Sequence, residues 1–123
     1  GASGNRRSMV EPIYKIAPRA LWEAAKAKGR FDGAPVDEAD GYIHFSTGQQ
    51  ARETAARHFA RQDDLLLIAV DPAKLGEALR FEPSRGGALF PHLYGQLPLD
   101  AVLWVEDLPL GADGNHQFPG SVR

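Results

Sequence analysis

The chain has 123 residues, of which 43% are hydrophobic and 24% charged, the size and composition of one globular domain and not of a disordered chain. Its net charge of −2 argues against general nucleic-acid binding, because that role needs clustered Lys and Arg. The absence of cysteine excludes disulfides, thiolate metal sites and cysteine nucleophiles, and fits the cytoplasmic location that we expect.

The ends of the chain differ in composition from its middle. Gly1–Ser8 is rich in Gly, Ser and Arg and precedes Met9, the only methionine, so we expect an expression-vector remnant followed by the native start. We expect residues 9–110 to form a single domain, and residues 111–123, with their Gly, Asp, Asn and Pro, to form a loose tail. No apolar run approaches the ~20 residues that cross a bilayer, so no membrane partner is expected.

The first part of the chain predicts a strand followed by a helix. Glu11–Ile16 is predicted as a short strand and the Ala-, Leu-, Glu- and Lys-rich Pro18–Lys28 as a helix, which Gly29 would end. Arg30–Asp40 contains Gly, Pro and four acidic residues, and we expect a solvated surface loop rather than a calcium site.

The central part predicts a second strand and helix. Gly41–Phe45 is the strand, and Ser46 with Gln49 three residues later has the pattern of a capping box. The helix is expected over Gln49–Arg61.

The remaining elements are mostly strands. The apolar run Leu65–Val70 predicts a strand that is covered on both faces, Leu79–Glu82 a half-buried strand, and Ala101–Leu108 a further strand. Pro91–Leu99 holds two prolines and a glycine, and we expect irregular structure there. Helices early and strands late indicate an α+β domain, with a curved mixed or antiparallel sheet and two main helices. The residues expected to be buried are Ile43, Phe45, Phe59, Leu67 and Leu103.

Strand alternation gathers polar groups on one face of Gly41–Phe45. Ile43 and Phe45 would face the core, whereas Tyr42 and His44 would share the opposite face, with Ser46 at the strand end. The helix that follows offers free amides to an anion or a polarised oxygen, so the segment is a candidate ligand site. The alternative is a solvated sheet face on which Ser46 is only a cap.

Further candidates lie in the second half of the chain. His92 and Tyr94 belong to the string FPHLYG, a loop that we expect to be rigid and able to carry ligand-binding groups. Glu82 ends its strand, where a carboxylate can orient a ribose or act as a base, although many such residues are merely exposed.

Two cations complete the candidate set. The guanidinium of Arg57 could bind phosphate, but pairing with Glu53 one helical turn away is the favoured interpretation. Lys15 shares a strand face with Ile13 and either extends from the edge of the core or contacts a ligand. No metal is expected: three histidines could in principle bind zinc, but nothing in their spacing supports it.

Five strings together resemble the bacterial family known as domain of unknown function 952 (DUF952), over about Ile13 to Leu108. They are IYKI (13–16), DGYIHFST (40–47), QDDLLLIAVDPAKLG (62–76), RFEPSRGGALFPHLYGQLP (80–98) and DAVLWVEDL (100–108). The combination of GYIHFST with FPHLYG is the specific feature.

That family is in turn distantly similar to ADP-ribosyltransferase-like domains, which bind NAD in a cleft between short strands. By position, the similarity assigns the polar residues of that fold to Lys15, to the segment Tyr42–Ser46 and to Glu82. It implies NAD as a substrate, a ribose oriented by Glu82, and phosphate or a second substrate near Arg57 and His92. Members more commonly have His where this chain has Lys15, and a protonated lysine cannot accept a hydrogen bond.

Three functions stay open on the sequence. The first is an enzyme, or a degenerate relative of one, acting on a nucleotide-like ligand, with Glu82 and His44 catalytic and no resident cofactor certain. The second is a non-catalytic module that binds a small molecule or peptide in the same cleft. The third is an interaction protein that exposes Trp22 and Trp104, although both tryptophans fit a core better.

Overall fold

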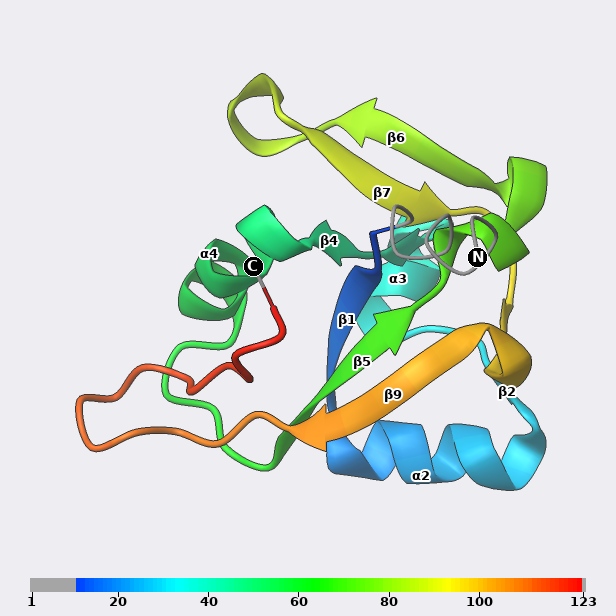
Figure 1. Ribbon diagram of the computed structural model, residues 1–123. Coiled ribbons are helices and arrows are strands. Elements are labelled where there is room, and N and C mark those ends of the chain that lie inside the picture. The colour runs from blue at the N-terminus through cyan, green and yellow to red at the C-terminus, as the bar shows by residue number, and fades with distance from the viewer. Residues whose placement is uncertain (1–10, 123) are drawn as a thin grey trace, which may run out of the picture.

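The computed structural model describes residues 11–122, so the expected native start at Met9 lies outside the described residues (Figure 1). The helices are α2 (Arg19–Lys28), α3 (Pro35–Asp40) and α4 (Gly48–His58). The strands are β1 (Ile13–Pro18), β2 (Arg30–Phe31), β3 (Ile43–His44), β4 (Ser46–Thr47), β5 (Leu65–Val70), β6 (Leu79–Pro83), β7 (Leu89–Leu93), β8 (Leu97–Pro98) and β9 (Val102–Asp107). Short 3₁₀ turns cover Pro72–Lys74, Gly76–Ala78, Arg85–Gly87 and Leu99–Ala101.

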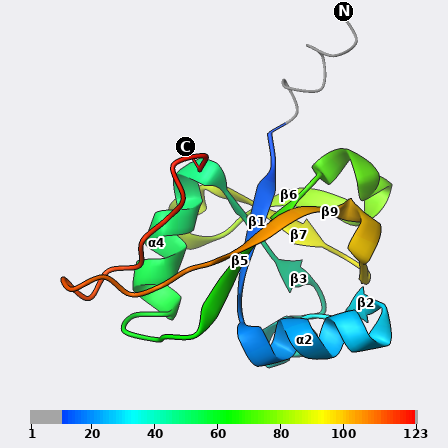
Figure 2. The ribbon, with the colours of Figure 1, turned by 60° about the horizontal axis from the view of Figure 1, so that its bottom comes forward.

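Within residues 11–122 the strands form three antiparallel sheets, and the α+β prediction is confirmed. The largest sheet has the order β4-β1-β5-β9, a second has the order β3-β7-β6, and β2 pairs with β8. The chain passes from the second sheet to the largest at Phe45, the single residue between β3 and β4. The pair β6 and β7 extends along one side of the molecule, away from α2 (Figures 1 and 2).

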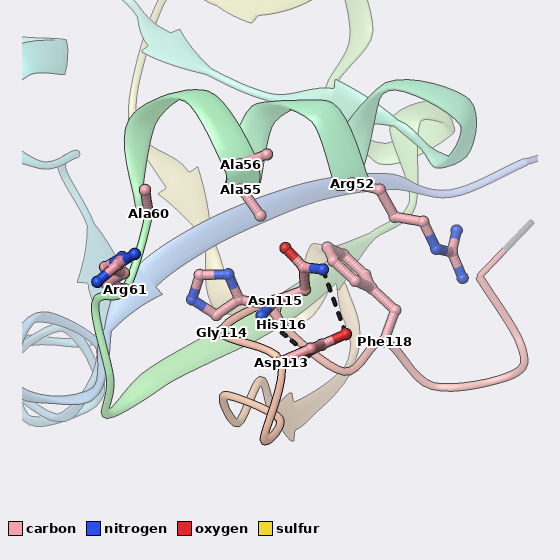
Figure 3. Close-up of a pocket in the computed structure, with 10 residues that line it drawn as sticks. All are labelled: Arg52, Ala55, Ala56, Ala60, Arg61, Asp113, Gly114, Asn115, His116 and Phe118. Atoms are coloured by element: carbon pink, nitrogen blue, oxygen red, sulfur yellow. Dashed lines mark hydrogen bonds between the residues drawn. The ribbon is translucent and has the colours of Figure 1, made fainter.

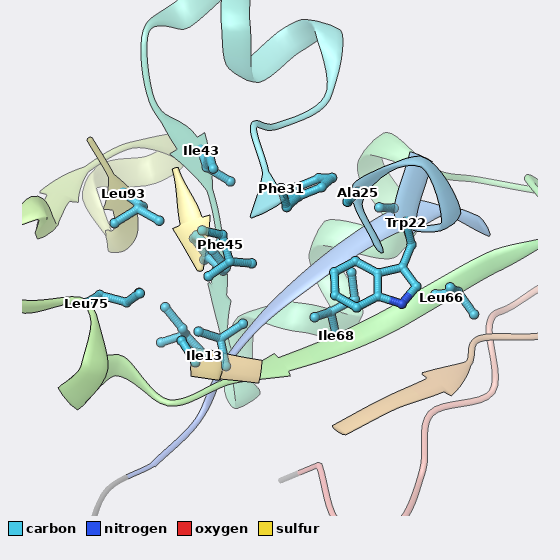
Figure 4. Packing of buried hydrophobic residues seen from close by; sticks show 14 residues of the cluster. Ile13, Trp22, Ala25, Phe31, Ile43, Phe45, Leu66, Ile68, Leu75 and Leu93 are labelled. Atoms are coloured by element: carbon cyan, nitrogen blue, oxygen red, sulfur yellow. The ribbon is translucent and has the colours of Figure 1, made fainter. Parts of the chain in front are cut away.

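The largest sheet is covered on both faces, as the run Leu65–Val70 predicts. Leu66, Ile68 and Val70 of β5 join one core cluster, and Leu65, Leu67 and Ala69 join the other. In the first cluster, Trp22 and Ala25 of α2 pack near Phe31, Leu66 and Ile68 (Figure 4). Every residue of β5 is therefore buried.

Both predicted main helices form, but the second begins differently. Helix α2 ends at Gly29, whose φ of 91° is the left-handed conformation that glycine adopts readily. Helix α4 is capped by Thr47 and not by Ser46: the Thr47 hydroxyl accepts from the amide of Gln50, and the Gln50 side chain accepts from the amide of Thr47. The capping box thus lies one residue later than predicted, because Ser46 is paired in β4 with Tyr14.

Four local predictions need correction. Pro91 lies within strand β7, opposite Phe81 of β6, and its carbonyl accepts from the amide of Phe45, so this part of Pro91–Leu99 is regular. The expected loop Arg30–Asp40 contains β2 and helix α3. Leu103 is 52% exposed because it lies at a β-bulge of the edge strand β9, where the register passes from Trp104 to Val102 and skips it. Phe59 is only half-buried. Ile43, Phe45 and Leu67 are buried as predicted.

The C-terminal segment packs on the domain more closely than its composition predicts. It lies beside α4 in both views (Figures 1 and 2). Phe118 packs against the second core cluster, and Val122 is buried within it. Leu110 and His116 form an isolated β-bridge that closes the loop between them. Within residues 11–122, no helix has the length and apolar character needed to span a membrane.

Candidate functional site

The sheet β3-β7-β6 separates an apolar face from a polar one. One row of cross-strand partners packs in or against the core and consists of Ile43, Leu93 and Leu79. The next row lies on the opposite face and consists of His44, His92 and Arg80. The alternation that sets Ile43 against His44 therefore extends across the sheet and aligns two imidazoles and a guanidinium.

The ring of Tyr42 lies at the centre of this polar face. Its centroid is 4.2 Å from that of His92 in a stacked arrangement, 4.7 Å from His44 and 5.1 Å from Tyr94. The two imidazoles are 5.6 Å apart, edge to face. His92 is buried, whereas Tyr94 is 41% exposed, so one side of this ring cluster is open to solvent.

Glu82 is held at the same place by two donors. One oxygen, Oε1, accepts from Nδ1 of His92 at 2.7 Å and from the hydroxyl of Tyr94 at 2.7 Å. The hydrogen bonds from His92 and then Tyr94 lower the pKa of Glu82, while the bond to Glu82 raises that of the Tyr94 phenol. The Glu82 side chain is 33% exposed, so the orientation of this carboxylate is fixed while it stays accessible. The guanidinium of Arg80 lies 5.3 Å from the centroid of Tyr94.

His44 contacts carboxylates at both ring nitrogens. Its Nδ1 lies 2.6 Å from Oδ1 of Asp37 and its Nε2 lies 2.9 Å from Oδ2 of Asp40. The same oxygen of Asp37 also accepts from the backbone amide of His44 at 3.1 Å. Asp37 therefore positions both the main chain and the ring of His44.

Asp37 itself is buried, at 1% exposure, although we expected a solvated acidic loop. Burial acts to raise its pKa, but the hydrogen bond from His44, the charge of Lys15 and further hydrogen bonds lower it to about 2. Lys15 approaches Asp37 at 2.8 Å and is also buried, and burial lowers the pKa of Lys15 against the pull of Asp37. The amide of Ala34 donates to Oδ2 at 2.7 Å. Gly33 permits this packing, because a Cβ at Gly33 would lie 2.8 Å from the Cβ of Asp37.

The structure brings most of the predicted site residues together. We call Tyr42, His44, Arg80, Glu82, His92 and Tyr94 the His44–Glu82 cluster; Lys15 supports it through Asp37. Ser46 and Arg57 add no contact to it within the described part of the chain: Ser46 is buried 2.8 Å from the hydroxyl of Thr54, and Arg57 pairs with Glu53 at 2.7 Å.

Sequence reasoning missed three residues. Asp37 and Asp40 were assigned to a solvated loop, and Arg80 was not among the candidates. One signal could have found Asp37. Pro35 starts a helix directly after Gly33 and Ala34, and Asp37 is the third residue of that helix, where an acidic side chain can accept from the backbone amide of the N-cap residue.

A separate hollow of about 430 Å³ lies between α4 and the C-terminal segment (Figure 3). Arg52 and Arg61 stand at opposite ends of it, with Ala55 and Ala56 along the helix side. None of the predicted site residues lines it. The guanidinium of Arg52 lies over the ring of Phe118 and donates to the carbonyl of Val122. We therefore locate the candidate site at the cluster and not at this hollow.

Metal-binding geometry is not found among the described residues, where no group of three His, Cys, Asp or Glu side chains could hold an ion. His44 and His92 are cross-strand partners in β3 and β7, whereas His58 is the last residue of α4 and belongs to neither strand.

Comparison with known proteins finds a matching family model and similar solved structures. The model of the family described as "Protein of unknown function (DUF952)" matches residues 16–105. The crystal structure of protein CC0527 from Caulobacter crescentus is 57% identical and superposes with a TM-score of 0.83, covering 86% of this chain and 93% of that one. Its solution NMR structure has a TM-score of 0.78 at 57% identity, covering 86% of this chain and 91% of that one. No curated protein matches.

Proposed function

Because the chain belongs to the DUF952 family, whose members are described as proteins of unknown function, we propose a function from its own site. The His44–Glu82 cluster binds a nucleotide-like ligand, with NAD as the first candidate, and catalyses ADP-ribosyl transfer or descends from enzymes that did. The observation that carries this proposal is the convergence of two imidazoles, two tyrosines, a carboxylate and a guanidinium on one partly exposed sheet face.

The groups of the cluster match the parts of a nucleotide. The rings of Tyr42 and Tyr94 offer surfaces on which a base or a nicotinamide can stack. Among the described residues, the hydrogen bonds to Glu82 all reach Oε1, so Oε2 can accept from ribose hydroxyls. Arg80 supplies positive charge beside Tyr94.

The corresponding chemistry needs an anion beside the ribose. The bond between the ribosyl carbon and nicotinamide breaks, nicotinamide leaves with the bonding electrons, and an acceptor oxygen bonds to the carbon as it loses its proton to solvent or a base. Positive charge develops on the ribose during this step, and a fixed carboxylate stabilises it. The lowered pKa of Glu82 keeps that carboxylate ionised at neutral pH.

A non-catalytic binding module is the second candidate, and one observation favours it. Lys15 stands at the position that the resemblance assigns to a ligand-binding group, yet it is buried and paired with Asp37. Its ammonium is thus committed to the protein and does not replace a histidine that could bind the ligand. In that case the cluster would bind the ligand without catalysing the reaction.

Thermal unfolding with NAD, ADP-ribose and adenosine tests binding, since a ligand that binds the folded state raises Tm. We expect NAD or ADP-ribose to raise the Tm of the wild type, and to raise the Tm of Glu82→Gln much less. Glu77→Gln is the control: it removes the same charge at an exposed position and should respond as the wild type does. Release of nicotinamide, measured by chromatography, separates the enzyme from the binding module. Equal shifts for Glu82→Gln and Glu77→Gln, or no shift with any nucleotide, would refute the proposed function.

A further inference from the structure

His44 lies between a buried carboxylate and an exposed one. Asp37, at Nδ1, has a side chain that is 1% exposed, whereas the side chain of Asp40, at Nε2, is 45% exposed. A carboxylate oxygen accepts hydrogen bonds, so both contacts are made together only when both ring nitrogens carry protons. In the doubly protonated form, His44 donates to one buried and one exposed acceptor.

The local charges balance only while Asp40 is present. Lys15 and a His44 ring protonated at both nitrogens supply two positive charges, which Asp37 and Asp40 neutralise. If Asp40 moved away, Nε2 of His44 would present an N–H donor with one uncompensated positive charge. That combination is what an oxyanion such as phosphate requires.

Asp40 is the partner that can leave. It is the last residue of the short helix α3, is followed by Gly41 in the left-handed conformation (φ 89°), and forms an exposed ion pair, a type of contact that adds little stability. Asp37 is instead held by Lys15, by the amides of Ala34 and His44, and by the His44 ring. The inner contact fixes the direction of the ring while the outer one can be exchanged.

We propose that Nε2 of His44 is an anion subsite for a phosphate oxygen of the ligand, and that the carboxylate of Asp40 fills this subsite in the free protein and gives way to the phosphate. The proposal rests on the proposed function and specifies its substrate class: a phosphorylated nucleotide is preferred to its nucleoside. Arg80, in the same cross-strand row beyond His92, is a further cation on this face.

Asp40→Ala tests the subsite, and Glu38→Ala is the matched control. Glu38 is an exposed acid of the same helix, and its substitution removes the same charge. By isothermal titration, Asp40→Ala should bind ADP-ribose about threefold to fivefold more tightly than wild type, the equivalent of one exposed ion pair, and adenosine with unchanged affinity. Glu38→Ala should match wild type. Equal effects of the two variants on ADP-ribose, or weaker ADP-ribose binding to Asp40→Ala, would overturn the subsite while the proposed function stands.

Inorganic pyrophosphate separates the two proposals if no nucleotide binds. Saturable shifts of the His44 backbone amide in NMR spectra, reached at lower pyrophosphate concentration in Asp40→Ala than in Glu38→Ala, would uphold the subsite while the nucleotide proposal fails. No shift of that amide in either variant would overturn the subsite as well. Asp40→Asn, which keeps the shape of the side chain, repeats the measurement should Asp40→Ala not fold.

Discussion

Replacing Asp37 with Ala should be among the most destabilising changes near the site. The substitution leaves the ammonium of Lys15 buried without its partner at 2.8 Å, and removes the acceptor of the amides of Ala34 and His44. Removing one member of a buried ion pair costs about 3–5 kcal/mol, because the other charge is left uncompensated. Since a domain is stable by only about 5–15 kcal/mol, this is a large part of the total.

Urea unfolding at pH 7, followed by circular dichroism, measures this cost as a lowered midpoint. The double variant Lys15→Met/Asp37→Leu should recover much of the loss, because an apolar pair in place of a buried ion pair is often neutral or stabilising. A cost of less than about 1 kcal/mol for Asp37→Ala would refute the argument, since that is the worth of an exposed ion pair. A double variant no more stable than Asp37→Ala would likewise show that unpaired charge is not the cause.

Three further outcomes are expected. The pKa of Asp37 is lowered from 3.8 to about 2, so its contribution of about 2 kcal/mol is present above pH 3.8 and is lost as pH falls through 2. Acid titration of stability should show this loss in wild type and not in Asp37→Ala. Leu67→Ala should cost about 2–5 kcal/mol and Leu103→Ala less than about 1 kcal/mol, measured by urea unfolding, because Leu67 is fully buried and Leu103 is 52% exposed. Thr47→Ala should cost about 1 kcal/mol and Gln49→Ala less than about 0.5 kcal/mol, because Thr47 and not its neighbours caps α4; equal costs would contradict the observed cap.

The sequence pattern predicted those features that depend on neighbouring residues: which segments form strands and which face of a strand is buried. The continuous apolar run Leu65–Val70 indicated a strand covered on both faces, and each face of β5 does belong to a different core cluster. Alternation across Gly41–Phe45 likewise separated Tyr42 and His44 from Ile43 and Phe45, and the cross-strand partner of His44 is His92. Tyr42 and His44 therefore followed from a period of two residues and lie together, whereas His92 was proposed from the string FPHLYG.

What the sequence did not reveal depends on contacts between distant residues. Asp37 is buried because Lys15, 22 residues earlier, neutralises it, and an acidic run by itself resembles a solvated loop. Ser46 was placed with His44 because alternation was assumed to continue, whereas the chain changes sheets at Phe45 and turns Ser46 toward Thr54. Pro91 suggested irregular structure, although proline fits a strand when its nitrogen is not needed as a donor.

The central claim is that the His44–Glu82 cluster is the ligand site, and an NMR titration of the backbone amides with NAD tests it most directly. We predict saturable shifts confined to residues 40–44, 80–82 and 92–94, which Glu82→Gln weakens and Glu77→Gln does not. Shifts that instead gather on α4 and the C-terminal segment would place the ligand in the hollow beside Arg52 and Arg61 and contradict the claim. The absence of saturable shifts at millimolar NAD would contradict it as well.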